Sequence, residues 1–329
     1  MNKNSLLTPL EKTITVDENL SQNKLINHSL SLLILAIAIV ALAFSPILTK
    51  LSELELSPTT IIFNRLWIST IIVSCWQLIG TTQSEQTSSL TKFNFNYQEP
   101  GLLLLASCSA TASAVFWAIS FTQTSIASST VLRSLTPLFI SLGAWLILKQ
   151  RFNSQFIIGM IVAIVGAMLI GWDDLQVGND YLVGDSIALL SAALHGINIL
   201  IIGYLRDRGC TTERVLLWRC IGGSLIVLPV VWLTDTQLLP ISLEGWLTVI
   251  ALAVVCQTFG QGLLVFSLKQ FSSSFVGIFT LLKPLVTALL AWAIFAEGLS
   301  ITSAIALILI LFGIYLAQSS GSSAQNSNS

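Results

Sequence analysis

The second half of this chain repeats the first. Residues 116–169 align with residues 263–316 without a gap, so that Pro137 falls on Pro284. Most of the other aligned pairs are either identical or exchange one apolar residue for another. An internal repeat of this length, made of apolar segments, predicts two structural copies packed together in a membrane with a path between them.

The composition also predicts an integral membrane protein. Hydrophobic residues make up 54% of the 329 residues and charged residues only 9%, whereas soluble domains carry about 25% charged residues. The five cysteines follow neither a disulfide framework nor a metal-ligand spacing. We therefore expect no metal and no cofactor, and we expect the lipid bilayer and a small-molecule substrate, but no nucleic acid, as partners.

About 20 mostly apolar residues are enough to cross a bilayer as a helix. Segments of this kind alternate with short breaks that contain helix-ending residues such as Pro58 and Gly298. The predicted fold is an all-α integral membrane protein of ten transmembrane helices in two repeats of five, although the soft boundary near residues 122–125 also leaves nine or eleven spans open. The expected spans are residues 30–48, 58–79, 101–121, 126–148, 154–172, 182–204, 214–233, 244–267, 272–296 and 300–317.

The spans divide the chain into four parts. Residues 30–172 form the first repeat and residues 182–317 the second. Residues 1–29 are predicted to be a flexible cytoplasmic tail, too long and too weakly basic for a typical signal peptide. The last part, residues 318–329, consists of small and polar residues and is predicted to be a disordered cytoplasmic tail.

The distribution of Lys and Arg predicts the orientation. With the N-terminus inside, the inner segments hold ten basic residues and the outer loops only Lys50, which places both termini in the cytoplasm by the positive-inside rule. Because five spans per copy is an odd number, the two copies must be inverted. The basic residues Lys149 and Arg151 then lie inside, while their counterparts Ala296 and Gly298 lie outside. The absence of a transit-peptide composition favours a bacterial inner (plasma) membrane.

Short motifs in both copies carry a family resemblance. The first copy has Ser-Leu-Thr-Pro-Leu-Phe at 134–139 and Lys-Gln-Arg at 149–151, and the second has Lys-Pro-Leu at 283–285 and Ala-Glu-Gly-Leu at 296–299. With the glycines that follow them, these stretches resemble the EamA repeat of the drug/metabolite transporter superfamily over nearly all of residues 30–318. The sequence departs from the repeat at Gln150, where the family usually has Glu, and at Ala306, where the other copy has a glycine.

The resemblance implies a ten-helix bundle with a substrate cavity between the copies. The fourth and ninth spans would line the cavity, with parts of the first, third, sixth and eighth. The fifth and tenth spans would be peripheral packing helices or would face a second copy, so that a homodimer is one expected arrangement. Small residues at Gly159, Ala163 and Gly166 agree with close packing of the fifth span.

Four basic residues lie within predicted spans: Arg65, Arg133, Arg219 and Lys283. Each costs about 2.5–3.5 kcal/mol at a helix centre on insertion scales, so each is a candidate functional residue. Arg65 and Arg219 lie near helix ends at matching points of the two copies. For this pair we favour a structural or gating role, because shallow arginines can extend to the interface or bind carbonyls at a helix end.

Lys283 and Arg133 are the main predicted substrate-binding residues. Lys283 lies near the middle of its span and immediately precedes Pro284, whose ring weakens the helix. Arg133 and Thr136, which aligns with Lys283, are three residues apart and share a helix face. Pro137 and Pro284 are therefore predicted gating positions. The alternative is that one or both bases are structural charges bonded to carbonyls.

No Asp or Glu lies in the middle of a predicted span, which predicts an electropositive cavity for a substrate with an anionic group. Uncharged residues would complete the site, and His195 is the one intramembrane group that titrates near neutral pH, either as a proton carrier or as a hydrogen-bonded packing residue. The predicted uncharged lining is Gln257, Gln261, Trp117, Thr136 and Asn198.

The sequence thus predicts a secondary transporter (exporter, exchanger or facilitator) that moves a small polar, anionic metabolite, such as an amino acid or organic acid, by alternating access. The first alternative is an exporter of cationic drugs or metabolites. The second is a non-transporting scaffold or a membrane-embedded enzyme. We find no catalytic residues and no Gly-x-x-x-x-Gly-Lys phosphate loop, and a scaffold does not explain four intramembrane bases.

Overall fold

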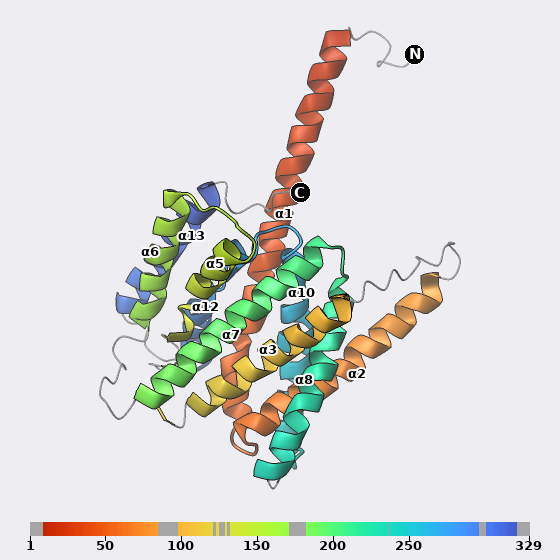
Figure 1. The fold of residues 1–329 in the computed structure, drawn as a ribbon, viewed down its shortest axis with the longest axis vertical. Coiled ribbons are helices and arrows are strands. Elements are labelled where there is room, and N and C mark those ends of the chain that lie inside the picture. Colours follow the sequence, from red (N-terminus) through yellow and green to blue (C-terminus); the bar gives the residue numbers. More distant parts are fainter. Residues whose placement is uncertain are drawn as a thin grey trace.

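The computed structural model describes residues 9–84, 98–120, 123–124, 129, 132–170, 182–235, 237–295 and 301–320. Every element within these ranges is a helix (Figure 1). The helices are α1 (Pro9–Ser52), α2 (Pro58–Ser84), α3 (Gln98–Ser120), α5 (Thr136–Leu146), α6 (Ser154–Ile170), α7 (Leu182–Asp207), α8 (Thr212–Thr234), α9 (Leu243–Ala251), η4 (Leu252–Gly260), α10 (Gln261–Ser267), α11 (Ser273–Phe279), α12 (Leu282–Phe295) and α13 (Ile301–Ser319).

Within the described ranges, 6 helices are long and apolar enough to cross a membrane. They lie on α1, α2, α3, α7, α8 and the continuous run from α9 to α10. Shorter apolar helices at Thr136–Leu146, Ser154–Leu169, Ser273–Thr287 and Ile308–Ser319 fall on the other predicted spans. Most of the N-terminal part of the predicted fourth span lies outside the described residues, so the number of ten spans stays a prediction.

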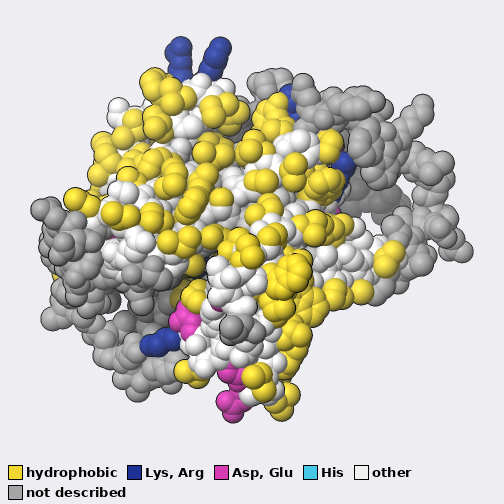
Figure 2. All heavy atoms as spheres, turned by 60° about the horizontal axis from the view of Figure 1, so that its bottom comes forward, with side chains coloured by type: hydrophobic (Ala, Val, Ile, Leu, Met, Phe, Trp, Pro, Cys, Tyr) yellow, Lys and Arg dark blue, Asp and Glu magenta, His cyan; other side chains and the backbone are white. Residues whose placement is uncertain are grey.

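The surface of the bundle is suited to lipid. Large apolar side chains such as Trp76, Trp232 and Leu233 are exposed. Figure 2 shows hydrophobic side chains spread over most of one face, with charged side chains gathered toward its rims. A water-soluble protein would rarely expose so wide an apolar surface.

The helix contacts repeat when the two copies are exchanged. Helix α3 of the first copy packs on α7 and α8, and the run from α9 to α10 in the second copy packs on α1 and α2. Helix α5 packs on α7, as its counterpart α12 packs on α1. The equivalent helices α2 and α8, and likewise α6 and α13, pack directly against each other. The fold therefore has an internal two-fold relation, as the sequence repeat predicts.

The pair α6 and α13 shows that the copies run in opposite directions. A Cβ atom added at Gly159 would lie 2.6 Å from the carbonyl oxygen of Gly313, and one added at Gly166 would lie 3.0 Å from that of Ala306. Residue numbers rise along α6 as they fall along α13, so the two helices are antiparallel. Small residues on the fifth span do allow a close helix contact, and the contact is with the tenth span.

Both the fourth and the ninth spans contain a break before their proline. Helix α5 begins at Thr136, after a turn at residues 134–135, and has Pro137 in its first turn. In the second copy, α11 ends at Phe279 and α12 begins at Leu282, so that Pro284 again lies in the first turn of a half-helix. Proline fits this position because the first turn does not need its N–H group.

Two features are not evident from the sequence. Helix α1 begins at Pro9 and runs well beyond the bundle (Figure 1), while the flexible cytoplasmic tail at residues 1–29 stays a prediction. In addition, residues 252–260 of the predicted eighth span form the π-helix η4, for which the apolar pattern gives no signal. Helix α13 reaches Ser319, and residues 321–329 of the predicted C-terminal tail lie outside the described residues.

Candidate functional site

The four intramembrane bases lie in one region of the bundle. Arg65 is on α2, Arg133 lies just before α5, Arg219 is on α8 and Lys283 is on α12. All four side chains are half-buried. Arg133 lies within electrostatic range of Arg65 and Arg219, and Lys283 within range of Arg133 and Arg65. We call these four residues the basic cluster. The structural or gating role expected for Arg65 and Arg219 stays a prediction.

No carboxylate among the described residues pairs with the basic cluster. The ion pair that the structure does contain joins Arg214 to Glu99, with a distance of 3.2 Å between the nitrogen and the oxygen. Other carboxylates accept hydrogen bonds near helix ends, as Asp185 does from Thr124 at 2.6 Å. Because the cluster is embedded in the bundle, its positive charge is neither paired nor fully hydrated, and such charges are costly.

Arg133 is held by two neighbouring helices. Its guanidinium group donates hydrogen bonds to the hydroxyls of Ser191 on α7 and, at 3.4 Å, of Ser113 on α3. The two serines also bond to each other's backbone, each hydroxyl donating to the carbonyl oxygen of the other residue at 2.8 Å. The guanidinium carbon lies 4.7 Å from the centre of the Trp117 ring, a cation–π distance. This arrangement fixes Arg133 between α3 and α7.

Arg219 is held by Gln261, whose side-chain oxygen accepts a hydrogen bond from it at 2.9 Å. The amide of Gln257 lies 3.8 Å from the sulfur of Cys220, next to Arg219 on α8. Both predicted glutamines therefore reach α8, although the π-helix changes the spacing between them that an α-helix would give. π-helical turns are frequent at functional sites.

Arg65 and Lys283 lack such support. The Nε atom of Arg65 is buried without a hydrogen-bond partner, and the described residues supply no hydrogen bond to the ammonium group of Lys283. The thiol of Cys256 on η4, which donates to the carbonyl oxygen of Ala41 at 3.3 Å, lies within the electrostatic range of both. The two unsupported cations therefore flank the same part of η4.

Helix geometry adds positive potential to the site. Arg133 lies shortly before the N-terminus of α5, and Lys283 lies in the first turn of α12. The N-terminus of a helix carries a partial positive charge, and broken helices in transporters direct such ends at anionic groups. Both half-helices thus begin at the basic cluster.

Three predicted residues have other surroundings. Asn198 is buried and donates from its amide to the carbonyl oxygen of Ala106 at 2.7 Å, which ties α7 to α3. Thr136 donates to the carbonyl oxygen of Arg133 at 2.7 Å and so closes the turn before α5. His195 is half-buried and lies within electrostatic range of Arg133, Arg219 and Lys283. The cluster would repel a further positive charge there.

Nothing in the sequence distinguishes Ser191 from the other serine of α7, Ser186. The role of Ser191 follows only from the structure, in which it bonds to both Arg133 and Ser113. Cys220 and Cys256 are buried, and both lie within electrostatic range of Arg65.

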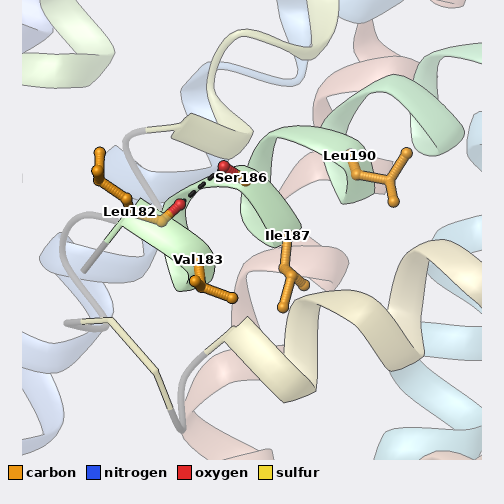
Figure 3. A pocket seen from close by; sticks show the side chains of 5 residues that line it. All are labelled: Leu182, Val183, Ser186, Ile187 and Leu190. Carbon is orange, nitrogen blue, oxygen red and sulfur yellow. Dashed lines mark hydrogen bonds between the residues drawn. The ribbon is translucent and has the colours of Figure 1, made fainter. Parts of the chain in front are cut away.

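A hollow on α7 is separate from the basic cluster. It has a volume of about 350 Å³ and is lined by Leu182, Val183, Ser186, Ile187 and Leu190 (Figure 3). Its one hydroxyl, that of Ser186, donates to the carbonyl oxygen of Leu182 in the same helix at 2.7 Å. This apolar lining offers no group that would recognise a polar substrate.

Comparison with known proteins agrees with the repeated architecture. Residues 29–172 and residues 182–318 each match the sequence model of the EamA-like transporter family. The chain belongs to this family. It is therefore an EamA-repeat protein of the drug/metabolite transporter superfamily and an integral, multi-pass membrane protein. Members of this family are transporters rather than enzymes.

The solved structures add information about the fold. A structure described only as the crystal structure of a protein matches with a TM-score of 0.75 and 16% sequence identity, over 88% of this chain and 96% of that one. At this identity the likeness concerns the fold alone. No curated protein matches the chain.

Proposed function

We propose that this EamA-family protein is a secondary transporter that moves a small polar metabolite with an anionic group by alternating access. The observation that carries the proposal is the basic cluster without a carboxylate partner. A bound anion would neutralise charges that the bundle leaves uncompensated. Guanidinium groups suit carboxylate and phosphate groups in particular, because their planar donors can bind two oxygens at once.

A cationic substrate fits this chemistry less well. An exporter of cations needs a negatively charged group in its cavity, and no described carboxylate pairs with the basic cluster; Asp235, for example, accepts a hydrogen bond from the hydroxyl of Thr59 at 2.7 Å at the end of α8. The repulsion between a cationic substrate and the basic cluster would oppose binding.

The proposal includes the membrane arrangement. It has ten spans in two inverted copies, with both termini in the cytoplasm of a bacterial-type inner membrane. Five helices per copy require the inversion, and the uneven distribution of Lys and Arg favours this orientation. The antiparallel contact between α6 and α13 supports the inversion. Rocking of the copies would expose the basic cluster to each side in turn.

Counterflow into proteoliposomes tests the proposal. Vesicles that contain the purified protein would be preloaded with unlabelled succinate, glycerol 3-phosphate, alanine or tetraphenylphosphonium, and uptake of the same labelled compound would be followed. We expect protein-dependent uptake of at least one compound with an anionic group and none of the lipophilic cation, relative to protein-free vesicles. Uptake of tetraphenylphosphonium alone would overturn the proposal.

A further inference from the structure

The basic cluster divides into two pairs by its hydrogen bonds. Arg133 is bonded to Ser191 and Ser113, and Arg219 to Gln261. Within the described part of the chain, Arg65 Nε is buried without a hydrogen-bond partner, and no hydrogen bond from a described residue reaches the ammonium of Lys283. A buried donor without a partner costs free energy unless something else satisfies it. Arg133 and Arg219 therefore donate to neutral side chains of the protein, whereas Arg65 and Lys283 are available to bind a ligand.

Arg65 and Lys283 are also near each other, although they belong to different copies. Lys283 lies within electrostatic range of Arg65, and the thiol of Cys256 lies within range of both. Helix α2 packs on η4, and α1 joins η4 to α12 through contacts with both. Two like charges in one partly buried region repel each other. No structural interaction among the described residues compensates for this repulsion.

We propose that Arg65 and Lys283 bind the substrate directly and together select a small anion that carries two negative charges. Arg133 and Arg219 position the walls of the same site through α3, α7, α8 and α10. This assignment rests on the proposed function and makes it more specific. It also gives Arg65 a substrate-binding role, whereas its sequence position suggests only a structural or gating role.

Charge balance is the reason for a doubly charged ligand. When the cavity closes, the substrate and its ligating groups lose most of their contact with water. Arg65 and Lys283 are the two cations that would contact the anion directly, and a singly charged anion would supply a counter-charge to only one of them. A phosphate ester or a dicarboxylate supplies two negative charges and enough acceptor oxygens for both donors. The two sources share this chemistry, and the experiment separates them.

The proposal makes an unusual prediction about stability. If Arg65 and Lys283 had structural roles, their neutralisation would destabilise the protein. If instead their role is to bind a ligand, their neutralisation relieves the repulsion between them and, at Arg65, removes a buried donor without a partner. The ligand-free variants Arg65→Gln and Lys283→Gln are then expected to unfold at the same temperature as the wild type or at a higher one.

Thermal unfolding of the full-length protein in detergent tests both parts. The dianionic probes are inorganic phosphate, glycerol 3-phosphate and succinate; the single-charge probes are acetate and lactate; tetraphenylphosphonium is the cationic probe. We expect at least one dianion to raise the unfolding temperature of the wild type, and neither monoanion to match it. The variants Arg65→Gln and Lys283→Gln are expected to bind that dianion about ten- to a hundredfold more weakly.

Two matched variants complete the experiment. Arg214→Gln removes one positive charge outside the cluster, at the ion pair with Glu99, and is expected to keep the wild-type affinity for the dianion. Arg65→Lys keeps the charge at position 65 and is expected to retain part of the binding that Arg65→Gln loses. Comparing the shifts in unfolding temperature with phosphate compounds and with succinate then shows whether the site binds a phosphate group or a dicarboxylate.

The outcomes separate this inference from the proposed function. Stabilisation by acetate or lactate as strong as by the dianions overturns the charge assignment, but leaves an anion transporter. Stabilisation by the lipophilic cation alone overturns both proposals. If Arg65→Gln or Lys283→Gln lowers the unfolding temperature without ligand and keeps the affinity, that residue is structural. A wild type that responds to none of the anions also overturns the inference.

Discussion

Gly159 on α6 packs with its backbone against the backbone of Gly313 on α13. A Cβ atom at position 159 would lie 2.6 Å from the carbonyl oxygen of Gly313, and a Cβ atom at position 313 would lie 2.5 Å from that of Gly159. Neither obstacle is a flexible side chain that could move aside. The absence of side chains at these two positions therefore determines how closely the fifth and tenth helices approach.

Gly159→Ala is expected to destabilise the protein. The added methyl group must push the two helices apart, and overpacking of this kind costs about 1–3 kcal/mol. The measurement is the thermal unfolding temperature in detergent. Gly101→Ala is the matched control, because a Cβ atom at Gly101 would meet nothing within 4 Å and alanine favours a helix over glycine. Equal unfolding temperatures for the two variants would contradict this account of the α6–α13 contact.

Ser191→Ala is expected to loosen Arg133. The substitution removes the hydroxyl that accepts from Arg133 and donates to the backbone of Ser113. Hydrogen bonds to charged groups contribute about 1.5–3 kcal/mol, so we expect a clear fall in the unfolding temperature. Ser186→Ala on the same helix removes a hydroxyl that bonds only to Leu182 in its own helix and serves as the control. If both variants unfold alike, Ser191 does not support Arg133.

Much of the architecture follows from the sequence because it depends on local patterns. The gap-free repeat predicted two copies, and exchange of the copies does reproduce the helix contacts. Pro137 and Pro284 lie just after the breaks in the fourth and ninth spans, but Pro229 lies inside the uninterrupted helix α8, so a proline alone does not predict a break. Small residues on the fifth span predicted a close contact, although they did not identify its partner as α13.

The arrangement of the site depended on tertiary contacts that no local pattern contains. Arg65 and Arg219 occupy similar positions in the two copies, yet Arg219 finds a partner in Gln261 and Arg65 Nε has none. The π-helix η4, which contains Gln257 and ends just before Gln261, has an ordinary apolar sequence. Ser191 acquires its role only because α3 and α7 pack side by side.

Glu55 gives the protein a pH-dependent contact at the turn between α1 and α2. The Ser242 hydroxyl and the backbone N–H groups of Ser242 and Ile241 donate to its carboxylate, which lowers the pKa of Glu55 from its usual value of 4.5. A lowered pKa in the folded state stabilises the fold above the unfolded-state value, and this stabilisation is lost as the pH falls through the folded-state value.

We therefore expect Glu55→Gln to unfold at a lower temperature than the wild type at pH 7. The difference is expected to shrink as the pH falls below about 4.5, because the wild-type carboxyl is then protonated as well. Thermal unfolding of both proteins across this range is the measurement. Glu53→Gln, which neutralises an exposed carboxylate two residues earlier, is the control. A difference that stays constant with pH would show that the hydrogen bonds to Glu55 do not depend on its charge.

Pro284→Ala tests whether the break between α11 and α12 serves transport. Proline at this position has no N–H group, and its ring excludes a regular helical bond to the carbonyl oxygen of Thr280. Alanine allows α11 and α12 to join into one helix, so we expect a higher unfolding temperature and slower counterflow in proteoliposomes. Pro229→Ala is the control, because Pro229 lies inside the uninterrupted helix α8. A Pro284→Ala protein that transports as fast as the wild type would show that the break is not a hinge.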